Sequence, residues 1–233
     1  PVLANGSTLA YTENAAAEAI NTAITVADAD NARLASAAVS ISGGFVAGQD
    51  VLGFVADSAS MGNIAGTWDS ATGVMSLSSA GETATLAQWQ AALRAVSYSN
   101  TSDSPNTAAR TVSYVVNDGT TASAAVTSSI NVTALNDAPV LTNGSTLSYA
   151  ENTAAAVVNT AITVTDVDNM TLASATVSIT GGFSSDEDAL GFANDGSTMG
   201  NIAAMASSLA RRDIPQHVGQ PQHSGANLEL CCQ

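Results

Sequence analysis

The sequence of 233 residues predicts an all-β protein, a β-sandwich with one short helix that is repeated in tandem and truncated in its second copy. The first observation behind this prediction is an internal repeat. Pro1–Ala15 returns as Pro139–Thr153, a period of 139 − 1 = 138 residues, and the copies align without a gap to Ala65 and Ala203. The other two are short alternating segments between turn signals, and a composition rich in Ala, Ser, Thr, Val and Gly.

The expected strands of the complete repeat are short runs rich in β-branched residues, in which apolar and polar positions alternate. In chain order they lie at Thr8–Thr12, Ala23–Ala27, Leu34–Ile41, Val51–Val55 and Val74–Ser79, followed by two closing strands around Val112–Val116 and Val126–Ala134. Seven or more such strands with regular turns are typical of a β-sandwich.

The end of the repeat carries the clearest local signals. Thr85 is expected to cap a helix in which Leu86, Trp89 and Leu93 recur at helical spacing, with Trp89 in the core. The two closing strands show strict alternation, and the first of them ends at the turn signal Asn117-Asp118-Gly119. These signals predict a helix followed by two half-buried strands.

The charge of the chain excludes several functions. Twenty acidic residues face five basic ones, all of them arginine, which gives a formal net charge of −15. Such a surface repels phosphate backbones and anionic lipid, so neither nucleic-acid binding nor membrane insertion is expected. No apolar run is long enough for a membrane span, and no signal peptide precedes the repeat, so Pro1 is interpreted as an internal cut from a longer chain.

The repeat also lacks most side chains of catalysis. Residues 1–203 contain no His, Cys or Lys, which leaves carboxylates, hydroxyls and backbone oxygens. Those groups are the ligands of hard cations rather than nucleophiles or zinc ligands. We therefore expect that the protein is not an enzyme and that it has no catalytic residues.

The sequence after Ala203 resembles an out-of-frame translation of the second copy. If a copy of Gln88–Asn117 were read in a shifted frame, each tail residue would combine the third base of one codon with two bases of the next. The matches include Asn100 with Gln216, Thr101 with His217, Val115 with Cys231 and Val116 with Cys232. We therefore expect three parts: a complete repeat 1–138, the N-terminal half of a second repeat 139–203, and an unstructured tail 204–233. A natural linker or interaction tail is the alternative.

Acidic residues gather at strand ends and at the repeat boundary. Asp28 and Asp30 form an Asp-x-Asp after an expected strand, where residues i and i+2 would point the same way and grip one cation. The other candidate ligands of the complete repeat and linker are Glu13, Asp118, Asn136 and Asp137, and those of the second copy are Glu151, Asp166 and Asp168. The competing interpretation of each motif is an Asp or Asn turn that satisfies its own backbone, and for Asn117-Asp118-Gly119 the two interpretations stay open.

Four of these motifs together resemble the calcium motifs of cadherins: Tyr-Thr-Glu-Asn, Val-Ala-Asp-Ala-Asp, Val-Asn-Asp-Gly and Leu-Asn-Asp-Ala-Pro. The chain is similar to the cadherin-like repeats of large secreted bacterial adhesins, which implies a Greek-key β-sandwich of cadherin/Ig-like type with Ca²⁺ as cofactor. It departs from the family in its shortened linker, in the missing Asp-Arg-Glu motif, near which Ser102-Asp103-Ser104 stands, and in extra sequence around Gly43–Leu93.

The resemblance implies a calcium-stiffened structural spacer at the bacterial cell surface or in the extracellular medium, where it supports cell adhesion. Its partners would be neighbouring repeats of the same chain, bound through calcium, with surface glycans or proteins as further partners of the parent adhesin. The alternative is a carbohydrate- or protein-binding module appended to an extracellular enzyme. Trp68, in Gly-Thr-Trp-Asp, is the aromatic residue on which that alternative depends. A minor cation site at Asp186–Asp188 is a further alternative.

Overall fold

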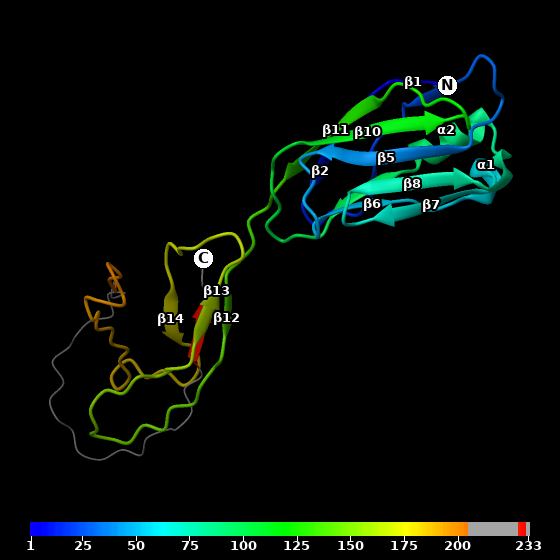
Figure 1. Ribbon diagram of the computed structural model, residues 1–233. Helices are drawn as coiled ribbons and strands as arrows, with labels where there is room; N and C mark the ends of the chain where they lie inside the picture. The colour runs from blue at the N-terminus through cyan, green and yellow to red at the C-terminus, as the bar shows by residue number, and fades with distance from the viewer. Residues whose placement is uncertain (205–227, 232–233) are drawn as a thin grey trace. The chain divides into compact units, whose positions relative to one another are not determined.

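The structure is a computed structural model that describes residues 1–204 and 228–231 (Figure 1). Its contacts divide the chain into two units, Pro1–Asp137 and Ala138–Gln233, which we call unit 1 and unit 2. The division falls next to the repeat boundary that the sequence places between Ala138 and Pro139. The fold is all-β, as predicted, with two short α-helices in unit 1.

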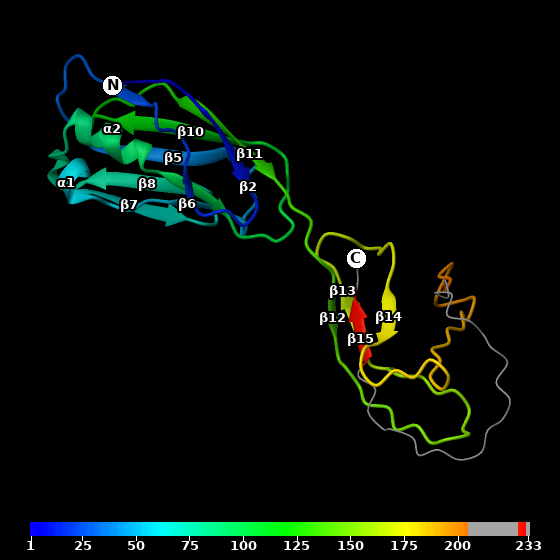
Figure 2. The ribbon, with the colours of Figure 1, turned by 180° about the vertical axis from the view of Figure 1, so that it is seen from behind.

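Unit 1 forms three sheets, one of which dominates. The strands are β1 (Val2–Ala4), β2 (Thr8–Thr12), β3 (Glu18–Ala19), β4 (Thr25–Ala27), β5 (Ser36–Gly43), β6 (Asp50–Gly53), β7 (Ile64–Asp69), β8 (Val74–Ser79), β9 (Ser97–Asn100), β10 (Arg110–Asn117) and β11 (Val126–Thr133). The helices are α1 (Ser58–Met61) and α2 (Leu86–Arg94), with a 3₁₀ turn at Ala80–Glu82. Six strands pair in the order β2-β11-β10-β5-β8-β7, three in the order β3-β9-β6, and β1 pairs with β4 (Figures 1 and 2).

The core of unit 1 lies between the large sheet and the elements that cover it. Tyr11 of β2 packs edge-on against Tyr98 of β9, with ring centroids 5.0 Å apart, so the six-stranded and three-stranded sheets share one core. Helix α2 begins with a capping box at Thr85, and its Trp89 is fully buried with its indole N–H donated to the Leu34 carbonyl at 3.0 Å. The predicted cap, helix and core position of Trp89 are confirmed.

The first and last long strands of unit 1 run parallel. In the register of the pair, Thr8 of β2 lies opposite Ser129 of β11, and Thr12 lies opposite Thr133. The chain therefore starts at one end of the unit, where the Pro1 amine forms a 3.0 Å ion pair with Asp28. It leaves at the other end, where the Glu13 amide donates to the Thr133 carbonyl. We call these the N-terminal and the C-terminal end of unit 1.

The strand predictions are confirmed where a segment of alternating residues was bounded by turn signals. β2 and β8 have the predicted bounds, and β4, β5, β6, β10 and β11 overlap their predictions closely. Five elements were not predicted: β1, β3, β7, β9 and α1. β3 has two residues, and β9 begins three residues after α2, so neither offers a window long enough for a period to be recognised.

Unit 2 reproduces only the part of the repeat whose pairing partners are local. β12 (Val140–Thr142) and β13 (Thr163–Thr165) pair as β1 and β4 do, and β14 (Thr176–Ile179) is the counterpart of β5. The counterparts of β2, β3 and β6, at 146–150, 156–157 and 188–191, form no strand. In unit 1 these three strands pair with β11 and β9, which belong to the half of the repeat that does not recur after Ala203.

The same loss uncovers the apolar face of unit 2. Tyr149 is 57% exposed, whereas its counterpart Tyr11 is 1% exposed. Leu172 is 40% exposed, and its counterpart Leu34 is fully buried. Local hydrogen bonds survive nevertheless: the Tyr149 hydroxyl donates to the Thr153 carbonyl at 2.7 Å, as Tyr11 does to Ala15. Local structure is thus kept while the packing that stabilises it is lost.

The tail departs from the expectation of an unstructured segment at one place. β15 (Leu228–Cys231) pairs antiparallel with β14. In unit 1 the counterpart of β14 has a partner on each side, so β14 presents backbone groups without their usual partners, and a short extended segment can pair with such an edge. The rest of the expectation, at residues 205–227 and 232–233, lies outside the described residues.

Candidate functional site

The Asp-x-Asp of unit 1 lies in a turn rather than in a strand. β4 ends at Ala27, and one Asp28 carboxylate oxygen, Oδ1, accepts hydrogen bonds from the amides of Asp30 and Asn31 at 2.9 and 3.0 Å. The other oxygen, Oδ2, pairs with the Pro1 amine. The extended geometry expected for Asp28 and Asp30 is therefore wrong, because the Asp28 side chain caps the backbone that follows it.

Asp118 is joined to this turn by a residue that the sequence interpretation did not select. The Asn31 side-chain amide donates to Asp118 Oδ2 at 3.2 Å. Asp118 Oδ1 accepts from the amides of Thr120 and Thr121 at 2.8 and 2.7 Å, which makes this segment a turn that satisfies its own backbone. The N-terminal end thus gathers Asp28, Asn31 and Asp118, and each carboxylate already accepts backbone hydrogen bonds.

These hydrogen bonds make the N-terminal end sensitive to acid. The backbone and hydroxyl donors of Thr121 and Thr120 lower the pKa of Asp118 to about 2, and the pKa of Asp28 is lowered by the amides of Asp30 and Asn31. A pKa below the unfolded value of about 4 means that the unfolded chain takes up the proton first. The contribution to stability is therefore complete above about pH 4 and is lost as the pH falls towards 2.

Asp118→Asn is accordingly expected to flatten the fall in melting temperature between about pH 5 and pH 2. Asparagine keeps the oxygen that accepts the backbone hydrogen bonds and removes the titration. Thermal unfolding followed by circular dichroism at several pH values measures the slope. Asp103→Asn, at an exposed loop position, is the control and should keep the original slope. Equal slopes for the two variants would refute the assignment.

The C-terminal end of unit 1 contains a buried carboxylate. Glu13 is 3% exposed, and its Oε2 accepts the amide of Leu135, the residue before the linker, at 2.7 Å. Its Oε1 is buried and accepts no hydrogen bond from the described residues. In the linker itself, the Asn136 side-chain amide donates to the Asp137 carbonyl at 2.7 Å. Unit 1 therefore brings the Glu13 carboxylate next to the linker.

In unit 2 the candidate ligands keep their local geometry. Asp166 Oδ1 accepts the amides of Asp168 and Asn169 at 3.0 and 2.7 Å, which repeats the Asp28 turn. Glu151, the counterpart of Glu13, is exposed. Asp188, in the segment considered as a minor cation site with Asp186, accepts the Ser184 amide at 2.8 Å. This contact repeats that of its counterpart Asp50 with Val46, so Asp188 is a turn residue.

The most strongly connected charged group of unit 1 is one that the sequence interpretation missed. Asp50 and Arg110 are 2% and 0% exposed, and Arg110 Nε lies 3.2 Å from both Asp50 carboxylate oxygens. The Tyr98 hydroxyl and the Asn100 amide donate to Asp50 Oδ1 at 2.6 and 2.9 Å. Burial, together with the hydrogen bond to Asp50, raises the pKa of Tyr98.

The alternation of β10 carried a signal for this pair. Arg110 shares the parity of Val112, Tyr114 and Val116, so it belongs to the buried face of the strand. A buried arginine requires an anionic partner. Its Nη1 bonds to the carbonyls of Asn106 and Ala108, and its Nη2 lies 3.1 Å from Asp50 Oδ1, so the group is enclosed by protein and ties β6, β9 and β10 together. This is structural chemistry with no open side for a substrate.

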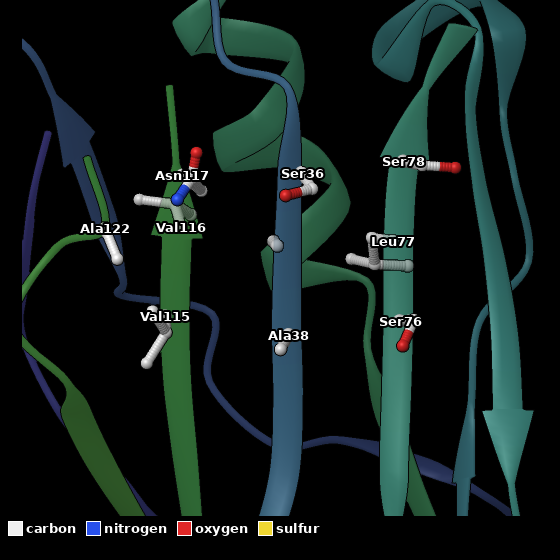
Figure 3. Close-up of a pocket in the computed structure, with 10 residues that line it drawn as sticks. Ser36, Ala38, Ser76, Leu77, Ser78, Val115, Val116, Asn117 and Ala122 are labelled. Carbon is white, nitrogen blue, oxygen red and sulfur yellow. The ribbon is translucent and has the colours of Figure 1, made fainter. Parts of the chain in front are cut away.

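A shallow groove crosses the large sheet over β10, β5 and β8 (Figure 3). None of the residues that line the groove is charged or aromatic. They are Ser36, Ala37, Ala38, Ser76, Leu77, Ser78, Val115, Val116, Asn117 and Ala122. The groove therefore offers no ring for stacking and no charge for an ion.

Within residues 1–204 and 228–231, no three His, Cys, Asp or Glu side chains are grouped closely enough to hold a metal ion. A search of the same residues for a helix that could cross a membrane also finds none. Comparison of the chain with protein-family models, with curated proteins and with solved structures gives no match.

Proposed function

We propose that this chain is a calcium-stiffened structural spacer repeat of a secreted or surface-anchored bacterial adhesin, with a Greek-key fold of cadherin/Ig-like type. Its task would be to hold neighbouring repeats of the same chain in line, and thereby to support cell adhesion. The observation that carries the proposal is the buried carboxylate of Glu13 at the C-terminal end of unit 1, directly beside the linker.

The path of the chain supports a spacer. Because β2 and β11 run parallel, the chain enters unit 1 at one end and leaves at the opposite end. Copies joined by a short linker would then follow one another along a line, and each added repeat would lengthen the array. A domain with both termini at one end would instead project sideways and add little to the length of the array.

Glu13 fits a hard cation. One of its oxygens is buried without a hydrogen bond from the described residues, and an ionised carboxylate in that state is costly unless a positive charge lies near it. Calcium takes carboxylate and carbonyl oxygens in flexible geometry. Following the cadherin arrangement, the ion would be held by Glu13, Asn136 and Asp137 of unit 1 with Asp166 and Asp168 of unit 2.

At the N-terminal end, Asp28, Asp30 and Asp118 would face a preceding repeat. The carboxylates of Asp28 and Asp118 accept hydrogen bonds from several backbone amides, which leaves fewer lone pairs for an ion. The second copy also has no counterpart of Asp118, since the repeat does not continue after Ala203. We therefore propose weak binding, with a dissociation constant of about 10⁻⁴–10⁻³ M, typical of extracellular calcium modules.

The binding-module alternative has less support. Trp68 is half-buried and packs edge-on against Phe45, with ring centroids 6.2 Å apart, so only part of its ring is available for stacking. The groove on the large sheet has no aromatic lining. A carbohydrate site would need such a ring or a set of polar groups that converge on a cleft.

The proposal is tested by the dimensions of two complete repeats, residues 1–138 joined in tandem, in small-angle X-ray scattering. Millimolar calcium is expected to increase the radius of gyration relative to a chelator. Glu13→Gln and Asp137→Ala in the first repeat should abolish the increase, while both repeats stay folded by circular dichroism. At a tenfold excess of calcium over the dissociation constant, the added stability is only about 1.4 kcal/mol, so stiffness is the sensitive measurement.

The matched control is Glu18→Gln, an identical change at an exposed glutamate of β3. It removes the same charge from the surface and should keep the response to calcium. If the unmutated tandem has the same dimensions in chelator and in calcium, the spacer mechanism is wrong and the binding-module alternative gains weight.

A further inference from the structure

Unit 2 has an exposed apolar face, and unit 1 shows which segment buries the equivalent face in a complete repeat. In unit 1, the first 65 residues are covered by Gly66–Asp137: β11 pairs with β2, β9 pairs with β3 and β6, and β10 and β8 flank β5. Residues 139–203 share about two-thirds of their positions with residues 1–65. The surface that they present is therefore a near copy of one that already has a complementary segment within this sequence.

The exposed side chains of unit 2 are those that the segment Gly66–Asp137 would bury. Tyr149, Leu172, Val177 and Leu190 are each at least 38% exposed, and their counterparts Tyr11, Leu34, Val39 and Leu52 are at most 1% exposed. Backbone contacts are missing as well. In unit 1 the Leu34 carbonyl accepts from Trp89 and the Ala32 carbonyl accepts from Leu86. Both donors belong to α2 of the missing half.

We propose that Pro139–Ala203 is a docking surface for the segment Gly66–Asp137 of a second copy of this chain. The docked pair would rebuild a complete repeat from two polypeptides, with β10 and β8 on the two sides of the β14 segment and one of them in the place of β15. Strand pairing supplies the backbone hydrogen bonds, and Trp89, Tyr98 and Tyr114 supply the apolar cover.

A chain cannot make this pairing with its own segment. Because β2 and β11 run parallel, the linker would have to return along the whole unit to bring Val140 to the N-terminal end of the rebuilt repeat. β11 alone has eight residues and is about 26 Å long. The six residues between Thr133 and Val140 reach about 25 Å when fully extended, with nothing left for the reversal. A complete repeat with β12 in the place of β1 therefore needs the segment of another copy.

Each copy holds one Gly66–Asp137 segment and two acceptors, residues 1–65 and residues 139–203, so one acceptor per copy stays uncovered. A reciprocal exchange between two copies closes a dimer. A head-to-tail exchange, in which each copy takes the segment of the next, generates open-ended assemblies.

The first test adds a Gly66–Asp137 fragment to the full chain. The full chain contains the same two tryptophans as the fragment, so docking is followed with a dye-labelled fragment and by the hydrogen exchange of residues 139–203. We expect saturable binding with slower exchange around Tyr149 and Val177. Leu172→Asp in the full chain should weaken binding at least tenfold, because a charge would enter the rebuilt core.

The matched control is Met170→Asp, two residues away. Met170 is fully exposed, and its counterpart Ala32 stays exposed in the complete repeat, so this variant should bind within about twofold of the unmutated chain. No binding at tens of micromolar would overturn the proposal. Equal binding to Leu172→Asp would also overturn it, because the fragment would then be entering unit 1 or adhering without specificity.

The second test uses the full chain alone. After unfolding in urea and refolding at increasing concentration, sedimentation should detect dimers and larger species, which become rare in Leu172→Asp and persist in Met170→Asp. Exchange confined to unit 1 would not depend on Leu172. Oligomers of equal abundance in both variants would therefore overturn the docking surface.

Discussion

Replacing Arg110 with methionine is expected to lower the free energy of unfolding of unit 1 by about 3–5 kcal/mol, the typical cost of breaking a buried ion pair on one side. Asp50 would remain buried with no cation, and the carbonyls of Asn106 and Ala108 would lose their donor. Methionine fills a similar volume, so the loss would report charge and hydrogen bonding more than a cavity. Urea unfolding followed by tryptophan fluorescence measures the change.

A double-mutant cycle separates the charge from the packing. Asp50→Asn combined with Arg110→Met removes both charges and should recover part of the loss, because no uncompensated ion is left in the core. Arg33→Met is the matched control, an identical substitution at an exposed position, and should change the stability by no more than about 0.5 kcal/mol. A loss for Arg110→Met no larger than that of the control would mean that the pair is not a stabilising link.

Amide exchange is expected to differ by at least about 10³-fold between equivalent positions of the two units. Val39-Ser40-Ile41 of β5 and Val177-Ser178-Ile179 of β14 are identical in sequence, so their intrinsic exchange rates match closely. β5 lies between β10 and β8, and opening it requires global unfolding of unit 1. β14 lacks both of those partners, and Val177 is 48% exposed.

Hydrogen–deuterium exchange with mass spectrometry or NMR measures this contrast within one sample, so solution conditions cancel. Ala23 and Ala161 are a useful internal comparison, because in each unit the amide donates to the side-chain oxygen of the asparagine two residues before it. Comparable protection of β5 and β14 would contradict the view that the half repeat lacks a stabilising core. It would also indicate that its apolar face is already covered.

Much of unit 1 could be predicted because local pattern and burial agree there. The alternation in β10 and β11 placed Val112, Tyr114 and Ile130 on the inner face, and the cap at Thr85 placed α2. β3 and β9 were out of reach because they are defined by their partners rather than by their own sequences. β9 is held by β6 on one side and β3 on the other.

The candidate site divides in the same way. The residues around Glu13 did not place it at the repeat boundary; only the resemblance to cadherin-like repeats did. The structure adds that the Glu13 carboxylate is buried and accepts the Leu135 amide. The geometry of Asp28 could not be obtained from strand periodicity, because its side chain competes with the strand by hydrogen-bonding the next amides. Asn31 was missed since its role depends on a contact with Asp118, which is 118 − 31 = 87 residues away.

The parallel pairing of β2 and β11 also determines how unit 1 would respond to mechanical load. A pull applied at the two ends of the unit draws these strands in opposite directions along their own length. The bonds of the five paired residues are then loaded in shear and must yield together, whereas strands peeled apart from one end would yield one bond at a time. A domain wired in this way withstands tension along the direction in which an array of such domains would be stretched.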